Sequence, residues 1–276
     1  MAVDTVTRKR AVTRKPRSGR SGDIGAVLAT AIIFIGGWEL IVRLRDVPPI
    51  VLPPPTLILQ KLYLGIVEGT FLTNLYYTLL ETLGGFLIAA VLGIVLGSLV
   101  AEISWIRRAI YPYIVGFQTI PKVALAPLLV VWFGFGLTSK VIVAATVAFF
   151  PIIVNTIEGI ANTERARIDL VRAAGAGKFE IFRRVKLPSA LPFIFAGLDA
   201  GIVLALLGAV VGEFIGARVG LGNQMLTFNA VLDISSSFAI LLLLSVIGYV
   251  LHLLLVLVQR KVVFWTGPST ALSNAT

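Results

Sequence analysis

A long uncharged run in the first half of the chain constrains its fold more than any other feature. Between Glu81 and Glu102 stand twenty residues, TLGGFLIAAVLGIVLGSLVA, and none of them carries a charge. A helix of that length is about 30 Å long, which matches the hydrocarbon core of a bilayer. The run therefore predicts a membrane-spanning helix, which can begin before Glu81.

The composition extends this interpretation to the whole chain. Of the 276 residues, 57% are hydrophobic and only 14% are charged, whereas about 25% are charged in an ordinary soluble domain. Unpaired backbone groups are costly in lipid, so a chain this apolar is expected to form helices. We therefore expect an all-α, polytopic protein embedded in a lipid bilayer.

Six segments are apolar enough and long enough to cross a membrane. They are 24–44, 82–101, about 109–135, 139–157, 189–211 and 237–259. After the first of them, the proline-rich stretch VPPIVLPPPTLI predicts an extended linker outside the hydrocarbon. Thr56 is expected to cap a short amphipathic helix that runs to about Glu68.

The basic residues are distributed unevenly around these spans. Of the 24 lysines and arginines, eighteen lie in the N-terminal tail, at 104–108, in 158–186 and at 260–261. The positive-inside rule places these segments, and therefore both termini, in the cytoplasm. We divide the chain into a disordered basic tail (1–23), a six-span domain (24–262) with a cytoplasmic loop at 158–188, and a flexible C-terminal tail (263–276).

Residues that carry enzyme chemistry are scarce. There is no cysteine, and the one histidine, His252, lies in the apolar run VLHLLLVLV, where a packed or headgroup-level residue is a better interpretation than a ligand. We expect no catalytic residues and no metal site, so a membrane enzyme or scaffold ranks last. The net charge of +10 indicates nucleic-acid binding only on a soluble surface. Here the basic residues bracket apolar spans, so we expect no nucleic acid partner.

The tetrapeptide GAGK (175–178) looks like the start of a phosphate-binding loop. A Walker A loop needs G-x-x-x-x-G-K-[ST]. With Gly177 and Lys178 as the GK pair, the first glycine is replaced by Arg172 and the final hydroxyl residue by Phe179. The motif fails at two of its four fixed positions, which excludes a nucleotide site here.

The whole loop around GAGK predicts a different structure. Apolar residues recur at near-helical spacing, at Ile168, Val171, Phe179 and Phe182. Gly175 and Gly177 interrupt that pattern, which predicts two short helices joined by a turn. Such amphipathic helices either lie on lipid or dock into a groove of a partner. Their periodicity does not separate these two alternatives.

The same loop resembles the cytoplasmic loop of permease subunits of ATP-binding cassette importers. That family has the pattern E-A-A, three residues, G, nine residues, I-x-L-P. Aligned on Gly175, this sequence places Val185-Lys186-Leu187-Pro188 at the end without a gap, and Asp169-Leu170-Val171 at the E-A-A. The acid is kept in type, whereas larger residues replace the two alanines.

Further stretches resemble the subfamily that imports nitrate, sulfonates, taurine, bicarbonate and vitamin precursors. They are VLPPPTLIL (51–59), TIPKVALAPLLVVWFGFG (119–136) and GAVVGEFIGARVGLG (208–222). The resemblance covers about residues 25–262 and implies a type I importer permease fold in the inner membrane. It also implies separate ATPase subunits, a second permease chain in a homodimer, an external solute-binding protein and no cofactor on this chain. The implied ATPase-coupling residues are Asp169, Arg172, Ala174, Gly175, Lys178, Phe179 and Pro188.

Charged residues within the spans are candidates for the solute pathway, because intramembrane charge is costly. Lys122 follows Pro121, a residue able to break the helix and free backbone carbonyls. Lys122 either attracts an anionic solute or forms an ion pair with Glu81 or Asp199. Glu213, like these two acids, is expected to face the bundle, and it precedes a glycine-rich re-entrant turn. The pathway residues we select are Gln118, Pro121, Lys122 and Glu213.

The sequence thus predicts the transmembrane subunit of an importer for a small, anionic or polar solute, coupled to ATPase subunits through the loop around Gly175. The alternative is a secondary transporter driven by an ion gradient. Such proteins commonly have two halves with matching broken helices. No second copy of the pattern formed by Pro112, Pro121 and Pro127 stands elsewhere in the chain.

Overall fold

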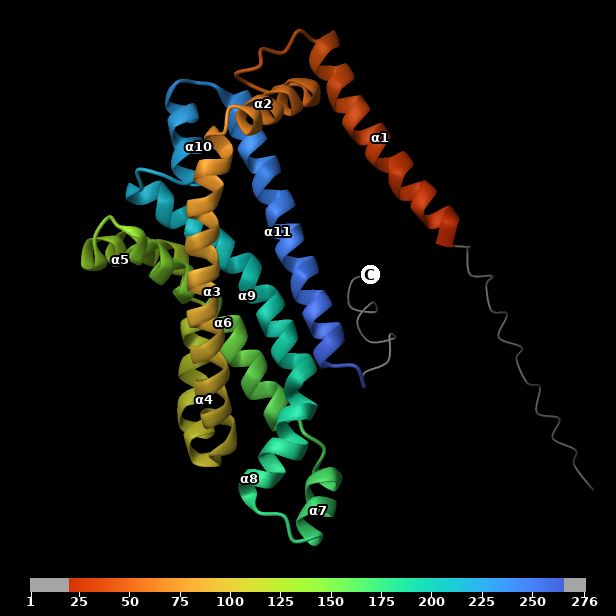
Figure 1. Cartoon of the computed structure of the whole chain (residues 1–276), viewed down its shortest axis with the longest axis vertical. Coiled ribbons are helices and arrows are strands. Elements are labelled where there is room, and N and C mark those ends of the chain that lie inside the picture. The colour runs from red at the N-terminus through yellow and green to blue at the C-terminus, as the bar shows by residue number, and fades with distance from the viewer. Residues whose placement is uncertain (1–19, 266–276) are drawn as a thin grey trace, which may run out of the picture.

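The computed structural model describes residues 20–265, and every regular element in that range is helical (Figure 1). The long helices form a bundle with two ends, which we call the α7–α8 end and the α10 end after the elements found there. The elements are α1 (Arg20–Leu44), α2 (Pro55–Val67), α3 (Thr70–Glu102), α4 (Ser104–Gln118), η1 (Lys122–Leu125), α5 (Ala126–Phe133), α6 (Leu137–Ala161), α7 (Arg165–Ala173), α8 (Lys178–Ile181), η2 (Phe182–Lys186), α9 (Leu187–Gly216), α10 (Leu221–Ala230) and α11 (Ile234–Val262).

Four helical units are long and apolar enough to cross a membrane: α3, α6, the continuous unit Lys178–Gly216 and α11. A fifth crossing is formed if α4 and the pair η1–α5 count as one span. α1 covers the first predicted span, and the total of six and the side of the termini stay predictions. The predicted tails lie mostly outside the described residues, although residues 20–23 begin α1.

The third predicted span is broken. α4 ends at Gln118, and the chain resumes at Lys122 with a change of direction of 85°, so that α5 lies across the bundle (Figure 1). Pro121 stands in the break, and it has no backbone N–H to continue the helical hydrogen bonds. The predicted break at Pro121 is confirmed.

The core of the bundle is a close approach of α6 to α3 and α9 through small residues. A Cβ added to Gly93 of α3 would lie 2.8 Å from Ile152 of α6, and one added to Gly97 would lie 2.9 Å from Thr156. Gly197 and Gly201 of α9 meet a neighbouring face of α6 equally closely, and Gly201, like Gly93, contacts Ile152. In lipid, where burial of apolar surface no longer drives association, such contacts supply the packing energy.

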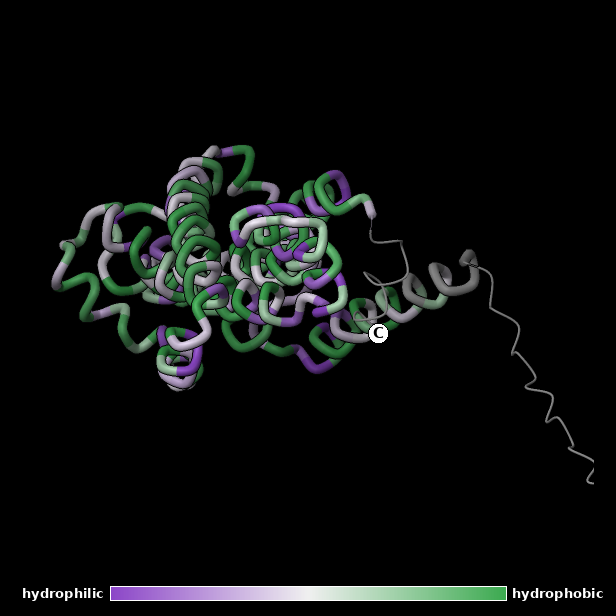
Figure 2. The backbone as a smooth tube through the Cα atoms, turned by 90° about the horizontal axis from the view of Figure 1, so that it is seen from below, coloured by the Kyte–Doolittle hydropathy of each residue, from purple (hydrophilic) through white to green (hydrophobic). Residues whose placement is uncertain are grey.

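Most of the outer surface is apolar, as contact with hydrocarbon requires. Figure 2 shows hydrophobic residues along the helices and hydrophilic ones in shorter stretches. Large apolar side chains such as Ile33, Phe34 and Val131 are more than 70% exposed. α1 leans away from the bundle and meets it near its last turns, where Trp38 packs edge-on against Phe238 of α11 (Figure 1).

The start of α2 is capped differently from the prediction. The helix begins at Pro55, one residue before Thr56. The Thr56 backbone N–H and hydroxyl both donate to the Glu39 carboxylate of α1, over 3.1 and 2.8 Å. The prediction that Thr56 caps α2 is therefore wrong, because a carboxylate from a neighbouring helix satisfies the open N-terminal turn instead.

Two adjacent glycines of α3 give a test of the close packing. A Cβ on Gly85 would lie 2.8 Å from backbone atoms of α6, whereas one on Gly84 would be in ordinary contact with Val141 at 3.4 Å. We expect Gly85→Ala to destabilise the purified protein by about 1–3 kcal/mol. Gly84→Ala is expected to be neutral or slightly stabilising, because alanine is the better helix former. Thermal unfolding in detergent measures both, and equal stability of the two variants would contradict this account of the core.

Candidate functional site

The α7–α8 element projects beyond the bundle at one end of the molecule (Figure 1). α7 and α8 are joined by a turn at 174–177, which confirms the predicted pair of short helices. Gly175 has a φ of +88°, and its backbone N–H donates to the Arg172 carbonyl over 2.9 Å. No atom lies within 4 Å of a Cβ added to Gly175. Glycine is therefore required here by backbone conformation rather than by space.

The tip of this element exposes apolar and charged side chains together. Leu170 and Phe179 are 73% and 75% exposed. Asp169 and Arg172 form an exposed ion pair of 2.8 Å within α7, a kind of contact that contributes about 0–1 kcal/mol. The structure gathers six predicted coupling residues at this tip: Asp169, Arg172, Ala174, Gly175, Lys178 and Phe179.

Pro188, the seventh, lies deeper, in the first turn of α9. It lines a groove of 410 Å³ together with residues of α7, η2 and the end of the described chain: Arg167, Leu170, Val171, Arg184, Val185, Ser189 and Trp265. This largely apolar groove lies beside the exposed tip of the α7–α8 element.

The element is joined firmly to the bundle. α8, the wider π-helical turn η2 and α9 form one helical unit of 39 residues, Lys178–Gly216. At the base of the element, the Lys186 ammonium donates to both oxygens of Glu102 at the end of α3, over 2.9 and 2.8 Å. The α7–α8 element is therefore attached to α3 as well as to α9.

A cluster of buried charged side chains lies toward the α10 end. Glu81 of α3, Lys140 of α6 and Glu213 of α9 are 2%, 2% and 0% exposed. We call these three residues and Thr78 the buried charge cluster. The prediction that Glu81 and Glu213 face the bundle is confirmed, and Glu213 is out of reach of solvent in this conformation.

The buried charge cluster holds the N-terminus of α10. The Glu213 carboxylate accepts hydrogen bonds from the Thr78 hydroxyl over 2.6 Å and from the Gly222 N–H over 2.5 Å. The Leu221 N–H donates to Thr78, and the Gly220 N–H donates to the Asn74 side chain. Side chains of α3 and α9 thus satisfy the N–H groups that a helix start leaves open.

Lys140 supplies the positive charge of the cluster, and the sequence reasoning did not select it. Its ammonium donates to the Gly216 carbonyl at the end of α9 over 3.2 Å and to the Phe135 carbonyl before α6. A cation at the C-terminal end of a helix is favoured by the helix dipole. The cost of intramembrane charge was the signal that could have found Lys140, but among the lysines it was applied only to Lys122.

A short turn joins α9 and α10 at the predicted glycines, and its re-entry into the membrane stays a prediction. α9 ends at Gly216, and Gly220 has a φ of +114°. A Cβ on Gly220 would lie 2.3 Å from the Glu213 carboxyl carbon. Both the backbone conformation and the contact with Glu213 therefore require glycine at position 220.

Lys122 lies at the break between α4 and α5, apart from this cluster. Its ammonium donates to the Gln118 carbonyl over 2.8 Å and lies 5.0 Å from the ring centre of Phe150. The alternative ion pairs with Glu81 or Asp199 do not form. Glu81 lies with Lys140 and Glu213, and Asp199 pairs with His252 over 2.5 Å. His252 is thus a hydrogen-bond partner of Asp199, and no group of metal-ligating residues occurs between residues 20 and 265.

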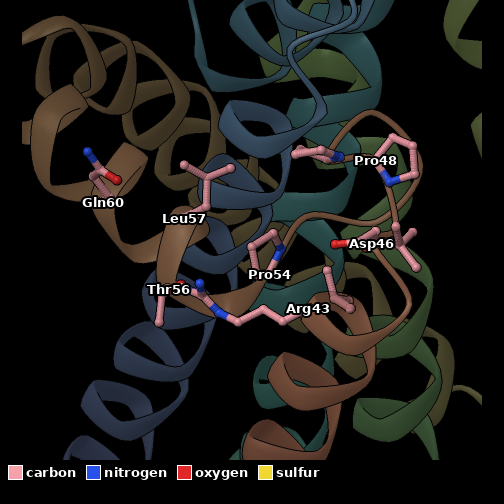
Figure 3. Close-up of a pocket in the computed structure, with 10 residues that line it drawn as sticks. Arg43, Asp46, Pro48, Pro54, Thr56, Leu57 and Gln60 are labelled. Atoms are coloured by element: carbon pink, nitrogen blue, oxygen red, sulfur yellow. Dashed lines mark hydrogen bonds between the residues drawn. The ribbon is translucent and has the colours of Figure 1, made fainter.

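An open groove of 770 Å³ lies between the end of α1, the proline-rich linker and α2 (Figure 3). In Figure 3 the Arg43 side chain extends toward Thr56, to whose hydroxyl it donates over 3.1 Å. Asp46 and Gln60 add further polar groups to the wall. Sequence reasoning did not predict this groove, because it depends on how α1 and α2 meet.

The described residues thus define a helical, multi-pass membrane protein with an exposed two-helix element at one end. Comparison with known families identifies the class of protein more closely. The family model for the binding-protein-dependent transport system inner membrane component matches residues 89–264. The chain belongs to this family, so it is a multi-pass transport permease of the inner membrane rather than an enzyme.

Curated relatives carry several transport names. The riboflavin transport system permease protein RibX of Chloroflexus aurantiacus is 37% identical over 236 residues, covering 86% of this chain and 88% of that protein. The formylaminopyrimidine transport permease protein ThiX of Halalkalibacterium halodurans is 39% identical over 211 residues, covering 76% and 84%. The putative aliphatic sulfonates transport permease protein SsuC of Bacillus subtilis is 30% identical over 259 residues, covering 94% of each chain.

A solved structure supports the fold. A chain of the MetNI methionine ABC transporter, in an inward-facing conformation, matches with a TM-score of 0.63. The match covers 71% of this chain and 97% of that chain at 18% sequence identity. The predicted likeness to an importer permease fold is confirmed.

The anchoring of α10 by Glu213 can be tested directly. We expect Glu213→Gln to weaken the bonds to Thr78 and Gly222 and to cost about 1–3 kcal/mol, because the amide group brings a donor where two donors converge. The chain has no cysteine, so a single Leu221→Cys reports release of α10 by its rate of thiol labelling. Leu221 is fully buried, and we expect labelling to rise at least about fivefold.

The matched control is Glu68→Gln, which makes the same chemical change at an exposed carboxylate. It should leave the labelling rate of Leu221→Cys unchanged. If Glu213→Gln also leaves that rate unchanged, Glu213 does not anchor α10.

Proposed function

We propose that this chain forms the solute pathway of an ATP-driven importer and is coupled to separate ATPase subunits through the α7–α8 element. The observation that carries the proposal is the exposed tip around Gly175, held at one end of a continuous helical unit, Lys178–Gly216. ATP is bound and hydrolysed on the partner subunits, and this chain carries no cofactor. The name of the family supports an external binding protein as a further partner.

The surface of the tip favours a protein partner over lipid or water. Leu170 and Phe179 present large apolar side chains, while the ion pairs Asp169–Arg172 and Arg167–Glu164 surround them with both signs of charge. A lipid surface attracts a basic face, whereas apolar anchors within a mixed polar rim are typical of protein interfaces. A groove in an ATPase subunit fits this pattern.

The proposed coupling is mechanical. When the ATPase subunits close, they displace the tip, and the helical unit from Lys178 to Glu213 carries that displacement about 50 Å toward the α10 end. The ion pair between Lys186 and Glu102 transmits part of this displacement to α3. The permease then exchanges between two arrangements, whose populations are set by the nucleotide state of the partners.

The solute pathway is proposed to pass the break between α4 and α5. Pro121 interrupts the helix, and the Gln118 carbonyl and Lys122 ammonium stand at the interruption. Among the described residues Lys122 has no acidic partner, and a cation in that position favours an anionic or polar solute. The relatives named for aliphatic sulfonates and for taurine agree with an anionic or zwitterionic solute. The relatives named for riboflavin and formylaminopyrimidine extend the proposed class of solute to other polar molecules. A second copy of this chain completes the pathway as a homodimer.

Substitutions at Gly175 test the coupling role. Valine is strained at a φ of +88°, at a cost of roughly 1–2 kcal/mol, so Gly175→Val should distort the turn. We expect solute uptake and stimulation of ATPase activity to fall at least about tenfold in reconstituted importer while membrane insertion is retained. Gly175→Asn, which tolerates this conformation, should keep most of the activity.

The neighbouring Gly177 provides a matched control, because its φ of −73° suits any residue. Gly177→Ala should transport normally. Normal transport and ATPase stimulation by Gly175→Val would show that the turn does not couple the subunits.

The energy source separates the importer from a secondary transporter. We expect ATP-depleted vesicles that contain the assembled importer and its binding protein to accumulate no solute under an imposed proton or sodium gradient. Uptake should appear when ATP is supplied on the ATPase side. Gradient-driven uptake without ATP would overturn the proposal in favour of a secondary transporter.

A further inference from the structure

A basic groove lies at the α7–α8 end, between the start of α4 and the end of α6. It has a volume of 540 Å³ and is lined by Arg107, Arg108, Tyr111, Pro112, Ile157, Glu158, Ala161 and Asn162. The four residues from α4 are spaced so that they share one face of that helix. The groove is distinct from the α7–α8 element and from the break at Pro121.

The two arginines of the groove have no acidic partner among the described residues, although Arg107 is only half-exposed. By contrast, Arg167 and Arg172 of α7 and Arg184 of η2 each pair with an acid three or four positions away. The donors of Arg107 and Arg108 are therefore free for a ligand. Guanidinium groups bind phosphate through paired hydrogen bonds.

The acidic residue of the groove is already engaged. The Tyr111 hydroxyl donates to the Glu158 carboxylate over 2.9 Å. The side chains of Arg107, Arg108 and Glu158 leave a net charge of +1 in the groove. Asn162, at the end of α6, adds an exposed amide that can donate to a phosphate oxygen. The charge and the donors both complement an anion.

The position of the groove favours a lipid as the source of that anion. Trp105, one turn before Arg108, is 67% exposed, and tryptophan is enriched where a membrane meets water. Pro112 and the buried Ile157 give the groove an apolar side. Basic pockets between helices on the cytoplasmic side are suited to acidic lipid headgroups.

We propose that this groove binds the phosphate headgroup of an anionic phospholipid of the cytoplasmic leaflet, held by Arg107 and Arg108. The lipid then bridges α4 and α6, next to the hydrogen bond from Tyr111 to Glu158. The assignment of the leaflet follows from the positive-inside orientation. The proposal does not depend on which solute is carried.

Native mass spectrometry of the assembled importer in a neutral detergent tests the proposal. Detergent removes the surface potential of the bilayer, so a retained lipid reports a site. We expect phosphatidylglycerol to bind at least about tenfold more tightly to the natural sequence than to an Arg107→Gln, Arg108→Gln double variant. Phosphatidylcholine, whose headgroup has no net charge, should bind more weakly than phosphatidylglycerol.

Two further variants separate a site from general charge and from misfolding. Arg260→Gln with Lys261→Gln removes the same charge at the end of α11, outside the groove, and should change binding by less than about twofold. Arg107→Lys with Arg108→Lys keeps the charge and should restore part of the affinity. ATPase activity of each variant shows that the importer is assembled.

Three outcomes would overturn the proposal. Equal loss of binding in the Arg260 and Lys261 variant would show general charge attraction rather than a site. Unchanged binding in the Arg107 and Arg108 glutamine variant would remove the groove as the location. Displacement of the lipid by inorganic phosphate in solution would point to a soluble phosphate ligand instead of a lipid.

Discussion

The close contact of α6 with both α3 and α9 is the interaction on which the rest of the structure depends. Glycine on α3 and α9 lets the three backbones approach closely, at positions such as Gly93 and Gly201. Only this approach brings Glu81, Lys140 and Glu213 within reach of one another, since they come from three different helices. The buried charges are tolerated because each has polar neighbours inside the bundle.

Several local features of this molecule are predictable from the sequence because their causes are local. The apolar runs predicted α3, α6, α9 and α11, and the family pattern and glycine positions predicted a turn at Gly175, whose φ of +88° confirms it. Pro121 removes a backbone donor, and the helix breaks beside it. Each of these features follows from residues close together in the sequence.

Other features could not be predicted because they depend on which way each helix is turned. Lys140 was passed over, although it is buried against the end of α9, whereas Lys122 proved to bond to a carbonyl of its own chain segment. The pairing of Asp199 with His252 requires α9 and α11 side by side. The cap of α2 comes from Glu39, seventeen residues away. The rotation of each helix about its axis, and the identity of its neighbours, follow from the packing of the whole bundle. No short pattern in the sequence specifies that packing.

Polar contacts join α3 to the helical unit Lys178–Gly216 toward both ends of the bundle. At the α7–α8 end Lys186 bonds to Glu102, and toward the α10 end Thr78 bonds to Glu213. In the described chain, α4 has a single side-chain hydrogen bond to α6, from Tyr111 to Glu158, and a break follows at Pro121. Polar side-chain contacts therefore tie α4 to its neighbours at fewer points than they tie α3 to the helical unit Lys178–Gly216, and the α4–α5 segment can shift against these helices at a lower cost in broken hydrogen bonds.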